Sequence, residues 1–149
     1  MSVIQFGDKA RMTYEMRKLQ DQPPALNFGG GNTAFVPPAS LACKLTAEHG
    51  PKQGYTTVIV FMSDGVAGDA AEAAKMLKQR AEADPKLFAS YTVGFGDNAS
   101  RTLESMAFAN GVQEKTNYRT ANVGNLGQVF EAVAARITPG RLQVRVWKI

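Results

Sequence analysis

The segment Thr56–Met62 (TTVIVFM) is almost continuously apolar and rich in β-branched residues. A run of this length and composition predicts a strand buried on both faces, as in a parallel sheet covered by helices. Ser63, Asp64 and Gly65 follow this run, so the carboxylate of Asp64 is expected in a turn directly after the strand. A second run, Phe88–Gly96 (FASYTVGFG), predicts another strand.

Helical patterns separate the predicted strands. Residues 37–50 begin with two prolines, carry apolar residues at helical spacing and stop at a glycine. Asp69 followed by Glu72 resembles a capping box for the next helix, whose apolar face is formed by Ala70, Ala73, Ala74, Leu77 and Ala81. Ser100–Ala109 and the segment that begins at Asn125 predict two further helices.

The two ends of the sequence predict strands at the edges of the sheet. Ser2–Phe6 and Ala10–Met16 predict a hairpin with a turn at Asp8. Arg141–Ile149 (RLQVRVWKI) alternates polar and apolar residues like a half-exposed edge strand. Because strands and helices alternate, we expect residues 1–149 to form one Rossmann-like, three-layer α/β/α domain, with a mostly parallel sheet and an antiparallel edge hairpin.

Composition narrows the classes of function. The chain has 149 residues and a net charge of +4, but its basic residues are interleaved with acidic ones, which argues against nucleic-acid binding. Its apolar runs are shorter than the roughly 20 residues that a bilayer crossing needs, and Met1–Ala10 lacks the pattern of a secretory signal. Cys43 is the single cysteine, which excludes an internal disulfide framework. We therefore expect a cytoplasmic protein whose partners include neither nucleic acid nor membrane.

Asp64 and the glycine-rich segment Gly29–Leu41 (GGGNTAFVPPASL) are the candidate functional residues. Ligands of parallel sheets bind beyond the carboxyl ends of the strands, where Asp64 is expected, although an aspartate there can also simply stabilise a turn. The glycines place the Thr33 hydroxyl at the head of a helix and formally match a dinucleotide loop, but no strand precedes them. A nucleotide- or phosphate-binding Rossmann-like enzyme that uses the GGGNT loop is the alternative function.

Five segments in chain order, SVIQFGDKA, GGGNTAFVPPASL, TTVIVFMSDG, FASYTVGFG and NLGQVFEAVAARI, together resemble a von Willebrand factor type A (vWA) domain. FMSDG and YTVGFG are most similar to intracellular members, including those attached to alpha-kinases. The resemblance implies a protein-interaction module without enzymatic activity. It also implies a metal-ion-dependent adhesion site at the carboxyl edge of the sheet, where Mg²⁺ or Mn²⁺ binds an acidic side chain of the protein partner.

Carried over by position, the resemblance makes Thr33 and Asp64 metal ligands. An alignment shifted by two residues would put Gly31 in place of Thr33 and remove that ligand. Asp8, after the first strand, is either a substitute ligand or a turn residue. The family's D-x-S-x-S motif is absent from this sequence, so we expect Mg²⁺ to bind weakly or not at all.

The central strand that normally precedes the D-x-S-x-S motif is also missing from this sequence. The resemblance therefore indicates a domain truncated at its N-terminus, a degenerate member, or a sheet in which another strand fills the central place. Truncation is favoured, because the alternating Arg and Lys of RLQVRVWKI suit an edge better than a core.

Overall fold

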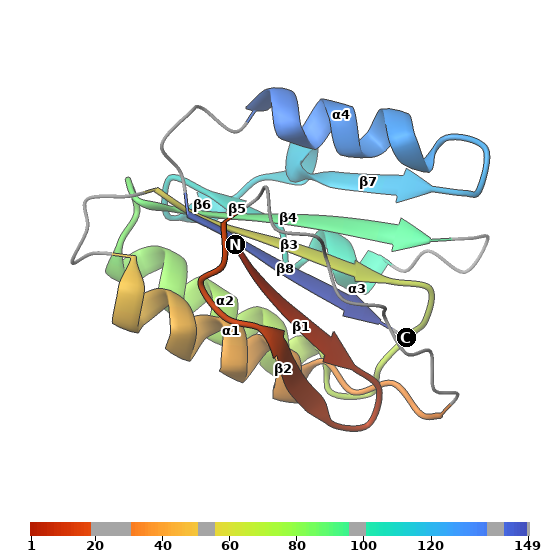
Figure 1. Ribbon diagram of the computed structural model, residues 1–149, viewed down its shortest axis with the longest axis horizontal. Coiled ribbons are helices and arrows are strands. Elements are labelled where there is room, and N and C mark those ends of the chain that lie inside the picture. Colours follow the sequence, from red (N-terminus) through yellow and green to blue (C-terminus); the bar gives the residue numbers. More distant parts are fainter. Residues whose placement is uncertain (19–30, 51–55, 96–100, 137–141, 149) are drawn as a thin grey trace.

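The computed structural model describes residues 1–18, 31–50, 56–95, 101–136 and 142–148 (Figure 1). In chain order its elements are β1 (Ser2–Phe6), β2 (Ala10–Tyr14), α1 (Val36–His49), β3 (Thr57–Ser63), α2 (Ala70–Ala83), β4 (Phe88–Phe95), α3 (Arg101–Glu104), β5 (Phe108–Ala109), β6 (Val112–Gln113), the 3-10 turn η2 (Lys115–Asn117), β7 (Tyr118–Ala121), α4 (Leu126–Arg136) and β8 (Leu142–Lys148).

The described strands form one mixed sheet in the order β2-β1-β8-β3-β4, after which β5 and β7 both pair with β4. β1, β8, β3, β4 and β7 run parallel to one another. The β1–β2 hairpin is antiparallel at one edge, and the short β5–β6 hairpin is antiparallel at the other. The predicted fold class, a mostly parallel sheet with an antiparallel edge hairpin, is confirmed.

The position of β8 corrects the sequence prediction. RLQVRVWKI was expected at an edge, but β8 lies between β1 and β3 and pairs with both in parallel. The physical reason is backbone pairing: β1 and β3 are buried strands, and each buried N–H or C=O left without a partner costs about 1–3 kcal/mol. Without β8, the facing edges of β1 and β3 would both lack backbone partners. The summed cost is larger than the cost of placing the polar residues Gln143 and Arg145 in a central strand.

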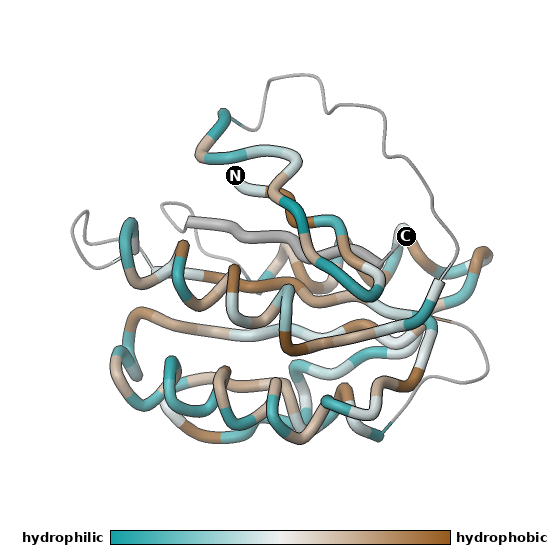
Figure 2. The backbone as a smooth tube through the Cα atoms, turned by 90° about the horizontal axis from the view of Figure 1, so that it is seen from below, coloured by the Kyte–Doolittle hydropathy of each residue, from teal (hydrophilic) through white to brown (hydrophobic). Residues whose placement is uncertain are grey.

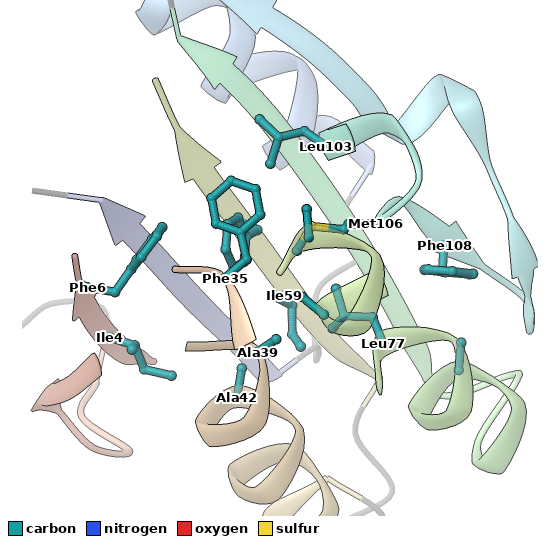
Figure 3. Close-up of a cluster of buried hydrophobic side chains, with 14 of the residues drawn as sticks. Ile4, Phe6, Phe35, Ala39, Ala42, Ile59, Leu77, Leu103, Met106 and Phe108 are labelled. Carbon is teal, nitrogen blue, oxygen red and sulfur yellow. The ribbon is translucent and has the colours of Figure 1, made fainter. Parts of the chain in front are cut away.

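Helices cover both faces of the sheet (Figure 1). α1 and α2 lie on one face, where the main cluster of buried side chains is centred on Ile4, Ile59, Phe61 and Leu77, several of which appear in Figure 3. α4 lies on the other face, over a smaller cluster that contains Val60, Tyr91 and Val133. Hydrophilic and hydrophobic residues alternate along the helices (Figure 2), as expected for helices that pack on a sheet through one side.

The segment predicted as a helix over Ser100–Ala109 is only partly helical. α3 ends at Glu104, and the chain continues into the β5–β6 hairpin. The turn of this hairpin is Asn110 and Gly111, with φ values of 53° and 78°, the positive pair that a type I′ turn requires. An Asn-Gly pair is a strong local hairpin signal, and here it outweighs the helical spacing that precedes it.

Candidate functional site

The carboxyl ends of the parallel strands align along one edge of the sheet. Phe6 of β1 is level with Lys148 of β8. Ser63 of β3 is level with Gly94 of β4, which is level with Thr120 of β7. Because β8 and β3 keep a single register throughout, these positions form one line across the sheet. We call the loops at this edge the carboxyl rim; its described segments are residues 7–9, 32–36, 64–69 and 122–125.

Asp64 lies on the carboxyl rim directly after β3, with an exposed side chain. The residue before it, Ser63, is buried, and its Oγ accepts a hydrogen bond from the Gly65 N–H at 3.2 Å. This bond closes a tight turn at the end of the strand. Asp64 is therefore at the strand end where the sequence predicts it, and its role as a metal ligand stays a prediction.

Thr33 is half-buried in the segment that leads into α1. The next residue, Ala34, donates its N–H to the carbonyl of Gly7 at 2.9 Å, which attaches this segment to the β1–β2 turn. Asp8 is exposed in that turn, and the Gly7 N–H donates to the carbonyl of Lys9 at 2.9 Å. The geometry at Asp8 is that of a turn residue.

Thr33 and Asp64 thus lie on the same rim but beside different strands. The Thr33 segment is attached to the end of β1, Asp64 follows β3, and β8 runs between these two strands. Neighbouring strands are about 4.8 Å apart, so the ends of β1 and β3 are separated by roughly 10 Å. The Thr33 segment is also joined to the loop after β3, through the hydrogen bonds of Phe35 and Val36 to Asp69, so the sharing of one ion by Thr33 and Asp64 stays a prediction.

Asp69 joins two segments of the rim, a role that differs from the helix cap that the sequence predicts for it. Its carboxylate accepts the N–H of Phe35 on Oδ1 and the N–H of Val36 on Oδ2, both at 2.8 Å. The expected capping box within α2 does not form, because the Asp69 side chain makes no cap hydrogen bond to its own helix. Asp69 instead joins the rim segment after β3 to the rim segment before α1, across 34 residues of sequence.

The cap formed by Asp69 bears directly on the alternative nucleotide-binding function. An α-helix begins with four N–H groups that have no partner within the helix, and these groups bind phosphate. In α1 the first two, from Phe35 and Val36, donate to Asp69, and the next two residues are Pro37 and Pro38, which have no N–H. The start of α1 therefore has no donor left for a phosphate, and the carboxylate beside it would repel one.

Cys43 lies on the side of α1 that faces α2, where its Sγ is 3.9 Å from the carbonyl oxygen of Met76. Burial raises the pKa of Cys43 to about 11, and the nearby Arg80 guanidinium offsets part of this effect. The raised pKa keeps this thiol protonated at neutral pH, which lowers its reactivity as a nucleophile. Cys43 packs against the main cluster of buried side chains.

Comparison with protein families identifies the domain. The model of the von Willebrand factor type A domain matches residues 1–132; the match ends before β8 begins. Comparisons with curated proteins and with solved structures gave no match. Over the described ranges, no helix combines the length and apolar character needed to cross a membrane. The family match, together with a parallel sheet covered on both faces by helices, shows that the chain belongs to the vWA domain family.

Proposed function

We propose that the chain is a protein-interaction module that binds its partner at the carboxyl rim. Membership of the vWA family supports a protein-binding function, because vWA domains are generally protein-binding modules and not enzymes. The observation that carries the location is the exposure of Val66 (64%) and Val123 (89%) on rim loops. The other strongly exposed large apolar side chain among the described residues, Val112, is on β6, beyond the strand β5 that pairs with the amino end of β4.

The two rim valines flank a charged position. Val66 is two residues after Asp64, and Val123 follows β7, which is separated from β3 by β4 alone. Burial of apolar surface is the main favourable contribution to most protein association, while charged side chains orient the partner. The carboxyl rim offers both kinds of side chain along one line.

We also propose that Mg²⁺ or Mn²⁺ contributes little to this interaction. Magnesium requires octahedral oxygen coordination at about 2.1 Å, and the described residues include no group of three or more His, Cys, Asp or Glu side chains that could hold a metal ion. Thr33 and Asp64, with Asp8 in reserve, would leave most coordination positions to water, so the residues present do not fit a tight site. Binding of an acidic partner side chain through the metal stays a prediction of the family resemblance.

The location is tested by comparing Val66→Asp with Val112→Asp. Both valines are 64% exposed, but only Val66 lies on the rim. The two variants therefore carry the same substitution at the same exposure and differ only in where it lies on the surface. The immobilised wild-type chain and both variants are incubated with the same cell extract, and captured proteins are quantified by mass spectrometry. We expect wild type and Val112→Asp to capture the same partner protein in similar amounts. Val66→Asp should capture about tenfold less of it, which corresponds to a loss of about 1.4 kcal/mol in binding free energy. Equal capture by both variants would place the binding surface elsewhere.

The metal is tested separately by calorimetric titration of the purified chain. We expect no tight binding of Mg²⁺ or Mn²⁺, and tight binding that Asp64→Ala abolishes would contradict the proposal. A thermal melting assay with ATP and NAD tests the alternative function, and the absence of phosphate donors at α1 predicts no stabilisation by either.

A further inference from the structure

A groove lies between α2 and the β5–β6 hairpin. It has a volume of about 580 Å³, and its apolar lining includes Ala74 of α2 and Phe108 of β5. Figure 3 shows the Phe108 side chain beside α2. The groove is away from the carboxyl rim, because β5 pairs with Ala89 and Ser90 at the amino end of β4. We call this space the hairpin groove.

The charged side chains of the hairpin groove are mostly basic. Lys75 and Lys78 line it from α2, and Glu82 is the one acidic residue of its lining. Lys78 and Glu82 form an ion pair, with 3.8 Å between Nζ and Oε1. Lys75 is exposed and makes no ion pair with any residue that the structure describes. The groove therefore presents one positive charge that no acidic residue of its lining offsets, which favours an acidic ligand.

The outer edge of β6 adds main-chain hydrogen-bonding groups to the hairpin groove. β6 pairs with β5 on one side and is the last strand of the described sheet on the other. The N–H of Glu114 donates to the carbonyl of Ala107 at 2.9 Å, so these two residues form a hydrogen-bonded pair. Such pairs alternate with non-hydrogen-bonded ones in an antiparallel ladder, and the next pair is Phe108 with Gln113. The N–H and C=O of Gln113 therefore point away from β5, to the outer edge of the sheet.

A strand edge of this kind binds an extended peptide by continuing the sheet, and the surface beside it selects the peptide's side chains. Gln113 and Lys75 line the same groove, so a segment that pairs with Gln113 passes close to α2. Every second side chain of an extended segment points to the same face. An acidic side chain at Lys75 and an apolar one at Phe108 are then two positions apart in the segment.

We propose that the hairpin groove is a second binding surface, which takes an extended acidic segment of another protein. The segment forms main-chain hydrogen bonds with Gln113, places an Asp or Glu side chain at Lys75, and buries an apolar side chain against Ala74 and Phe108. Charge decides the class of ligand, since a basic segment would meet Lys75 and Lys78 without a compensating acid.

The class of ligand is tested by selecting random linear peptides displayed on phage against the immobilised full-length chain. Enriched peptides are synthesised and titrated by fluorescence anisotropy. We expect them to carry Asp or Glu two positions from an apolar residue, and to bind Lys75→Glu about fivefold more weakly than wild type. Lys44→Glu is the matched control, because it makes the same change at an exposed position of α1 outside the groove. It should bind the peptides like wild type.

A charge swap keeps this test decisive if Lys75→Glu alters the fold. The selected peptide with its acidic residues replaced by Lys should bind Lys75→Glu more tightly than wild type, whereas an unfolded variant would bind neither peptide specifically. Selection of peptides without acidic residues, or equal binding by wild type and Lys75→Glu, would overturn the proposal. Self-association of the chain that Lys75→Glu abolishes would make a second copy the occupant, and would overturn it as well.

The main-chain contact is tested by amide hydrogen exchange in the presence of the selected peptide. Exchange of the Gln113 N–H should slow, whereas that of Glu114, which already has a partner in Ala107, should not change. An unchanged rate at Gln113 would contradict pairing with β6.

The hairpin groove and the carboxyl rim are distinguished by two variants. Val112 also lines the groove, so Val112→Asp adds a negative charge there and should weaken binding of the acidic peptides, whereas Val66→Asp should not. This order is the reverse of that expected for a partner at the rim. The two proposals can therefore fail independently of each other.

Discussion

Replacing Asp69 by alanine tests whether one carboxylate holds the starts of two helices together. The carboxylate accepts the N–H groups of Phe35 and Val36 at 2.8 Å each. Phe35 is completely buried, so water cannot replace the lost acceptor, whereas the half-buried Val36 can recover part of the loss. Because a hydrogen bond to a charged group contributes about 1.5–3 kcal/mol, we expect Asp69→Ala to lower the free energy of unfolding by about 2–4 kcal/mol.

Urea unfolding followed by circular dichroism measures this loss by linear extrapolation. Asp69→Asn keeps one oxygen acceptor and should lose about half as much. Glu72→Ala is the matched control, because the sequence pattern pairs Glu72 with Asp69 in a capping box, whereas the structure leaves Glu72 exposed on α2. It should cost less than about 1 kcal/mol, the usual contribution of an acid in the first turn.

Equal losses for Asp69→Ala and Glu72→Ala would refute the link between α1 and α2, as would a loss below about 0.5 kcal/mol for Asp69→Ala, which is the level of an ordinary surface change. Amide hydrogen exchange gives an independent readout. The Phe35 and Val36 N–H groups should exchange faster in Asp69→Ala than in wild type, because both lose their acceptor.

Two further predictions concern packing away from the rim. Burial raises the pKa of Cys43 from 9.0 to about 11, so the unfolded chain releases this proton first, and stability falls as the pH rises through that window. Between pH 9 and pH 11, the free energy of unfolding of wild type should therefore fall faster than that of Cys43→Ala, by up to about 1.4 kcal/mol per pH unit in urea unfolding. If the two stability curves run parallel over this range, the pKa of Cys43 is not raised by burial. Gly111 has a φ of 78°, and an added Cβ would lie 2.9 Å from Cβ of Pro85, so Gly111→Ala should cost about 1–3 kcal/mol in the same assay. Gly68→Ala, whose Cβ would meet nothing within 4 Å, should be close to neutral, and equal costs would show that neither φ nor the proline contact matters.

The elements that were predicted well are those whose signals are local. The apolar run of β3 and the proline-led start of α1 each carry enough information in one short segment. The helix predicted over Ser100–Ala109 ends early, at Glu104, because the chain turns into a hairpin at Asn110–Gly111, a pair that is itself a turn signal in the sequence. A consistent rule that an Asn-Gly pair ends a helix would have found the β5–β6 hairpin.

The place of β8 could not be read from its own residues. Its alternating pattern describes the side chains, but its position is decided by two strands, β1 and β3, whose inner edges need partners. The same limit applies to Asp69, whose partners at Phe35 and Val36 are more than 30 residues away. Capping rules are local, so they pair Asp69 with Glu72 and miss the bond across helices.

Hydrogen bonds between the rim segments join the same two segments that a shared metal ion would join. Ala34 ties the Thr33 segment to the β1–β2 turn, and Asp69 ties the same segment to the loop that follows Asp64. An ion shared by Thr33 and Asp64 would join these same two segments a second time, and so would add little order to them. A rim that is ordered by folding loses little further conformational entropy when a partner binds. By this reasoning Asp69→Ala, which leaves Val66 and Asp64 in place, should weaken partner binding at the rim, whereas a metal chelator should not.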